Sequence, residues 1–77
     1  MRVEILSDGF SVGKRAIIDN GNAEGRHIRL IDDDCLIYIA PGTYCTIVSR
    51  TMGSYAIVQL DIGKWRCEID INQLTLV

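Results

Sequence analysis

The sequence predicts an all-β domain of five to seven short antiparallel strands, with one 3-10 turn before the last strand. Of its 77 residues, 21 are β-branched (12 Ile, 5 Val and 4 Thr). Such side chains lose rotamer freedom in helices and pack well on pleated sheets. Short apolar segments also recur along the chain with turn residues between them, which is typical of small all-β proteins. At this length we expect a single domain over residues 1–77.

The N-terminal half contains four such segments. In the first, Val3 and Ile5 alternate with charged residues, as in a half-buried strand. Asparagine and glycine at 20–22 tolerate positive φ and favour a turn after the second segment. Pro41 cannot donate to a ladder and ends the fourth. We expect strands of the main domain at 14–19, 26–31 and 35–39, preceded by one at 1–6 in the N-terminal extension.

The C-terminal half has the clearest pattern. Two alternating segments flank a short turn at 51–54, which predicts a hairpin. A second tight turn, Asp61 to Gly63, leads into another strand, and residues 70–73 are typical of a single 3-10 turn. We expect strands at 43–50, 55–60, 64–69 and 74–77.

The alternation in the hairpin assigns side chains to two faces of the sheet, because successive residues of a strand point to opposite sides. One set fits a protein interior and is listed here: Cys45, Ile47, Ala56, Val58 and Leu60. In the next strand Trp65 shares a face with Cys67 and Ile69, so we expect all three in the core. Cys45 and Cys67 then act as small buried apolar residues.

The other face of the hairpin is also rich in apolar side chains, at Tyr44, Val48, Tyr55 and Ile57. A solvated face of a sheet is mostly polar. Two explanations are open. Either the N-terminal segment with Phe10 and Val12 covers this face, or the face is an interface, since large exposed apolar patches are unusual on monomers. We favour the second and expect these four residues to contact a protein partner, with a second copy of this chain as the leading candidate.

The order of these segments resembles a small SH3-like barrel of the KOW and Tudor type. The residues that carry the resemblance are those at 28–30, 41–48, 56–63 and 72–77. It covers about residues 26–77, with residues 1–13 as an N-terminal extension packed on that core. The resemblance implies an SH3-like binding or interaction module that is not an enzyme. It does not specify a ligand, because one fold serves many functions.

Nucleic-acid binding is the alternative function. The net charge of −2 argues against it, because phosphate contacts require a basic surface. A local patch is nevertheless available if strands 14–19 and 26–31 pair as a hairpin. Such a ribbon brings together four basic residues, Arg15, Arg26, His27 and Arg29.

No motif predicts catalysis, a metal site or a cofactor. His27 and the three cysteines are separated by eight, ten and 22 positions, without the paired knuckles of a zinc site. The acidic run at 32–34 lacks the alternation of a calcium loop and predicts a solvated turn. We therefore expect no enzyme activity, no cofactor and no metal.

The sequence also bears on location. No apolar run approaches the roughly 20 residues that span a bilayer, so we expect no membrane partner. The chain starts with Met1-Arg2-Val3-Glu4, unlike a secretory signal, and its cysteines are odd in number and scattered. These features predict a cytoplasmic protein.

Overall fold

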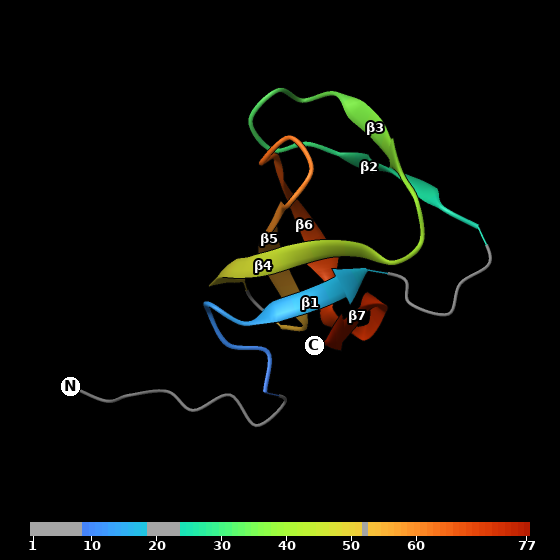
Figure 1. Ribbon diagram of the computed structural model, residues 1–77. Coiled ribbons are helices and arrows are strands. Elements are labelled where there is room, and N and C mark those ends of the chain that lie inside the picture. The colour runs from blue at the N-terminus through green and yellow to red at the C-terminus, as the bar shows by residue number, and fades with distance from the viewer. Residues whose placement is uncertain (1–8, 19–23, 52) are drawn as a thin grey trace.

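The computed structural model describes residues 9–18, 24–51 and 53–77, and these form a small all-β fold (Figure 1). Seven short strands and one 3-10 turn follow one another almost where the sequence predicts them. The expected strand at residues 1–6 lies outside the described residues. The elements are β1 (Arg15–Ile18), β2 (Arg26–Arg29), β3 (Leu36–Ile39), β4 (Thr43–Arg50), β5 (Tyr55–Leu60), β6 (Arg66–Asp70), the 3-10 turn η1 (Ile71–Gln73) and β7 (Leu74–Leu76).

The strands form two antiparallel sheets. Five of them pair in the order β6-β5-β4-β1-β7, and the other two make the separate hairpin β2-β3. The long strand β4 crosses in front of β5 and β6, so the larger sheet curls around the core, and the β2-β3 hairpin projects from it (Figure 1). The predicted hairpin between 14–19 and 26–31 is wrong. Strand β1 pairs instead with β4 and β7, and β2 pairs with β3.

The inward face of the β4-β5 hairpin forms the centre of the core, as the alternation predicts. The side chains of Cys45, Ile47, Ala56, Val58 and Leu60 have no solvent-accessible surface. Strands β1, β6 and β7 complete the core, and Ile28 and Ile39 of the smaller sheet pack onto it. The residues added by these other elements are Ala16, Ile18, Ile28, Ile39, Cys67, Ile69, Ile71 and Leu74.

Trp65 is not part of this core, so the prediction for it is wrong. The turn before β6 runs through Gly63 and Lys64, whose φ angles of 67° and 56° are left-handed. Trp65 lies immediately after this turn, and its carbonyl accepts the Leu60 N–H at 2.7 Å. Its ring packs over the backbone of Gly63, where an added Cβ would come within 2.6 Å of the ring. Trp65 has the parity of the buried residues, but it lies beyond the end of the core and is 36% exposed.

Residues 9–13 run beside β4. The Gly13 N–H donates to the Ile47 carbonyl at 2.8 Å, and Arg50 Nη1 donates to the Phe10 carbonyl at 3.1 Å. Phe10 packs against the core cluster, whereas Val12 is 63% exposed. These two residues therefore do not cover the outer face of the hairpin as a pair. Within the described part of the chain, no helix has the length and apolar character needed to cross a membrane.

Candidate functional site: a pocket between β2 and β6

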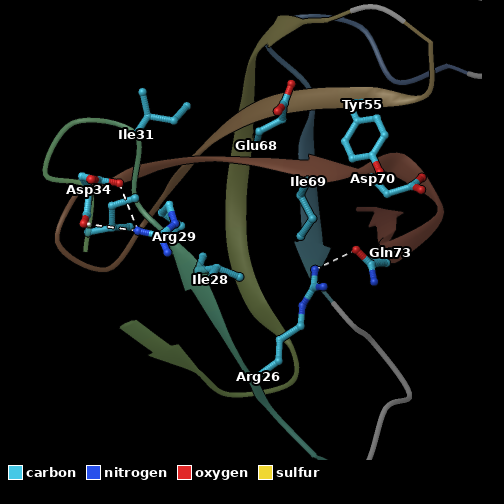
Figure 2. Close-up of a pocket in the computed structure, with 11 residues that line it drawn as sticks. Arg26, Ile28, Arg29, Ile31, Asp34, Tyr55, Glu68, Ile69, Asp70 and Gln73 are labelled. Carbon is cyan, nitrogen blue, oxygen red and sulfur yellow. Dashed lines mark hydrogen bonds and ion pairs between the residues drawn. The ribbon is translucent and has the colours of Figure 1, made fainter. Parts of the chain in front are cut away.

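A pocket of about 620 Å³ opens between β2 and β6. Its volume lies within the range of roughly 300–1,000 Å³ that is usual for ligand sites. Figure 2 shows side chains from β2 on one side of the opening and side chains from β6 and η1 on the other. Its lining residues are Arg26, Ile28, Arg29, Leu30, Ile31, Asp34, Tyr55, Glu68, Ile69, Asp70 and Gln73.

The pocket exists because β2 and β6 belong to different sheets, and hydrogen bonds connect the β2 side to the β6 and η1 side at both ends of the space. At one end the Ile31 N–H donates to the Arg66 carbonyl at 2.9 Å. At the other end Arg26 Nη2 donates to Gln73 Oε1 at 2.8 Å (Figure 2). Between these two contacts the strands are not paired in a ladder, so a space remains along the edge of β6.

The floor of the pocket is apolar, because Ile28, Leu30 and Ile69 reach it from the core side. These three side chains are buried. Tyr55 lies at the rim and is 47% exposed, so its ring is available to a bound molecule. Six of the eleven lining residues are polar or charged, so the space is an apolar floor surrounded by a polar rim.

The two walls of the pocket carry different charges. On the β2 side, Arg29 forms an ion pair of 3.0 Å with Asp34, and Arg26 reaches toward η1. On the β6 side lie two carboxylates. Asp70 Oδ1 accepts the Asn72 N–H at 2.9 Å and caps η1, whereas Glu68 is exposed and forms no ion pair with another described residue. The β6 wall is therefore acidic and open to solvent.

The four basic residues predicted to form a patch do not lie on one ribbon. Arg26, His27 and Arg29 share β2, where the His27 ring meets that of Tyr38 edge-on at 5.5 Å. Arg15 lies in the other sheet, on β1. Both of its terminal nitrogens donate to the Asp61 carboxylate, each at 2.6 Å.

The Arg15–Asp61 pair favours the charged form of both groups. Their hydrogen bond raises the pKa of Arg15 and lowers that of Asp61. The guanidinium carbon also lies 5.9 Å from the centre of the Tyr44 ring, within cation–π distance. Arg15 is therefore engaged within its own sheet.

The four predicted interface residues all lie on the β4-β5 hairpin, but not as one continuous apolar patch. Tyr44 and Tyr55 are at opposite ends of it, roughly 20 Å apart at about 3.3 Å per residue. Val48 is the extra residue of a β-bulge, beside the pair formed by Ser49 and Ile57. Val48 and Ile57 are half-buried. Their role as a protein interface remains a prediction.

Tyr55 belongs to both surfaces, because it ends the outer face of the hairpin and also lines the pocket. Arg26 and Arg29, two residues of the predicted basic patch, also line the pocket. The sequence prediction missed other lining residues, including Glu68, Asp70 and Gln73. One signal was available, since charged residues occupy alternate positions at 66, 68 and 70. Alternation of this kind marks an exposed strand face, but it does not reveal what lies opposite.

Cys45 and Cys67 are fully buried, as the alternation predicts, and Cys35 is exposed. Burial raises the pKa of the Cys45 thiol to about 12 and that of Cys67 to about 11. Two of the four residues weighed as zinc ligands are thus core residues, and the described part of the chain contains no group of three metal-ligating side chains.

Comparison with known proteins gives no match: no family model, no curated protein and no solved structure is significantly similar to this chain.

Proposed function

We propose that this chain is a non-enzymatic, SH3-like binding module, that it recognises a protein partner, and that the pocket between β2 and β6 is its recognition site. The observation that carries the proposal is the pocket itself. It combines an apolar floor of Ile28, Leu30 and Ile69 with the exposed ring of Tyr55 at its rim. Aromatic side chains beside apolar pockets are typical anchors of protein interfaces.

The order of elements supports the SH3-like assignment. A first strand pairs with both the longest strand and the last one, and a projecting hairpin follows it. Three consecutive strands, β4 to β6, then form a meander, and a 3-10 turn precedes the final strand.

The composition of the pocket supports binding over catalysis. Among the described residues that line it there is no serine, cysteine, histidine or lysine. Carboxylates can also act as nucleophiles or bases, but Asp34 is paired with Arg29 and Asp70 accepts the Asn72 N–H. Its acidic side chains also favour a protein ligand over nucleic acid, because carboxylates repel phosphates. Arg29 is moreover already paired with Asp34.

A matched pair of substitutions tests this proposal. Tyr44 and Tyr55 are both 47% exposed and both lie on the β4-β5 hairpin, but only Tyr55 lines the pocket. Peptides selected from a random displayed library on the folded protein are measured by titration against Tyr55→Ala and Tyr44→Ala. We expect Tyr55→Ala to weaken binding about tenfold or more and Tyr44→Ala to leave it unchanged.

Two results contradict the proposal. One is a library from which no binding peptide emerges. The other is a set of peptides whose binding depends on Tyr44 and not on Tyr55. For nucleic acid, the matching titration uses single-stranded RNA and duplex DNA at two salt concentrations. Binding that falls steeply with salt favours the nucleic-acid alternative and refutes a protein-specific site.

A further inference from the structure

The edge of β6 that faces the pocket is a strand edge without a neighbour over part of its length. In the β5-β6 ladder the Leu60 N–H donates to the Trp65 carbonyl, and the Ile71 N–H donates to the Ser54 carbonyl. In an antiparallel pair such bonds recur at every second residue. The backbone N–H and carbonyl groups of Cys67 and Ile69 therefore point toward β5. Those of Arg66, Glu68 and Asp70 point away from it.

The outward-pointing groups are only partly used. The Arg66 carbonyl accepts the Ile31 N–H at 2.9 Å, which confirms the direction of this edge. Beyond that bond, the backbone N–H and carbonyl of Glu68 have no hydrogen-bond partner among the described residues. An unpaired strand edge is a template for an added strand.

We propose that the pocket binds its protein partner by β-strand addition, with an extended segment of the partner pairing along the edge of β6 beside Glu68. This inference rests on the proposed function and deepens it, since it specifies how the partner is held. Main-chain hydrogen bonds supply affinity in this mode, and alternate side chains supply specificity. The pocket provides both, because the open edge and the apolar floor belong to the same space.

The geometry also specifies the sequence of the partner segment. A residue placed opposite Glu68 in antiparallel register exchanges two main-chain hydrogen bonds with it and shares its outward face. A basic side chain there meets the exposed Glu68 carboxylate. The residues on either side point to the other face, toward Ile69 and Ile28, and so must be apolar. The ligand class is therefore an extended peptide in which apolar and basic residues alternate.

Backbone methylation of a peptide tests the pairing directly. The probe is an acetylated and amidated peptide, Val-Lys-Val-Lys-Val. Methylation of the lysine amides removes the N–H groups that face β6, and methylation of the valine amides removes those that face away. We expect the lysine-methylated peptide to bind at least about tenfold more weakly and the valine-methylated peptide to keep most of its affinity. We also expect the exchange of the Glu68 amide proton to slow when the unmodified peptide binds.

A charge reversal tests the specificity. Glu68→Lys replaces an exposed side chain without touching the core, and Asp33→Lys makes the same charge change in an exposed loop outside the pocket lining. We expect Glu68→Lys to prefer Val-Glu-Val-Glu-Val over the lysine peptide. Asp33→Lys should bind the lysine peptide like the unmodified protein.

The outcomes separate this inference from the function on which it rests. If library-selected peptides bind in a Tyr55-dependent way but Glu68 amide exchange stays unchanged, strand addition is refuted and the protein-binding function stands. Equal loss of affinity on methylation of lysine and valine amides also refutes it. If neither the library nor the lysine peptide yields any binding, both proposals fail.

Discussion

The burial of Cys45 and Cys67 allows a quantitative prediction of how slowly their thiols react in the folded protein. Only the thiolate form of cysteine reacts with disulfide reagents. At pH 8 a thiol with the ordinary pKa of 9.0 is about 10% ionised, whereas pKa values of about 11 and about 12 leave about 0.1% and about 0.01%. The folded protein therefore holds roughly 100-fold less thiolate at Cys67 and roughly 1,000-fold less at Cys45 than an ordinary thiol does. Their lack of exposed surface slows the reaction further.

The assay is the reaction of the native protein with an aromatic disulfide reagent at pH 8. We expect one equivalent of thiol to react quickly, from the exposed Cys35, and two further equivalents to react only after unfolding in denaturant. The Cys35→Ser variant should lose the fast phase and keep the two slow equivalents. The reasoning is refuted if native Cys35→Ser still reacts quickly, because Cys45 or Cys67 would then lie outside the core.

The same burial predicts instability in alkali. The unfolded chain loses the protons of these thiols near pH 9.0, but the folded chain retains them until the pH reaches about 11 at Cys67 and about 12 at Cys45. Because the folded-state pKa is raised, the stability linked to the neutral thiols is complete below pH 9 and is lost as the pH rises toward 12. Thermal midpoints measured by circular dichroism should fall across this range, and less steeply in Cys45→Val. An equal slope in the two proteins would contradict the assignment.

Three other predictions concern the sheet. Leu60→Ala, at a fully buried position, should cost about 2–5 kcal/mol in chemical denaturation, and Ile62→Ala, at a position 61% exposed, should cost much less; equal costs would contradict the core. Asp61→Asn should lower the thermal midpoint at pH 7 because Arg15 loses its charged partner. Since this pairing lowers the pKa of Asp61, the difference in thermal midpoint from the unmodified protein should vanish as the pH falls below 3.8 and through the folded-state value. A difference that persists at pH 2 would contradict this assignment. If the outer face of β4-β5 mediates self-association, Ile57→Lys should shift a dimer toward monomer in analytical ultracentrifugation, whereas an unmodified protein that already sediments as a monomer at high micromolar concentration excludes this association.

Local pattern was sufficient to predict the all-β class and the approximate positions of the described strands. The alternation at 56, 58 and 60 identifies the buried face of β5, because strand geometry forces a period of two. Turn residues locate the strand ends, since Pro41 and Gly63 restrict or free the backbone at their own positions in the chain. These predictions depend only on residues close in sequence.

What the sequence did not reveal depends on distant contacts. Strand β1 pairs with β4 and β7 and not with the next strand in the chain, and no local feature near Arg15 specifies that choice. The pocket is harder still to predict, because it is the space between two strands about 40 residues apart. The prediction that Trp65 is buried was wrong for a different reason. Its position in the alternation is that of a core residue, but the core ends before it.

The most direct test of the central claim, that the pocket between β2 and β6 binds a protein segment, is a map of amide chemical shifts on titration with a library-selected peptide. We predict that the largest changes fall at Glu68, Ile69 and Tyr55, on one side of the pocket, and at Ile28 on the other. Changes confined to the far end of the hairpin around Tyr44, or absent throughout, would contradict it.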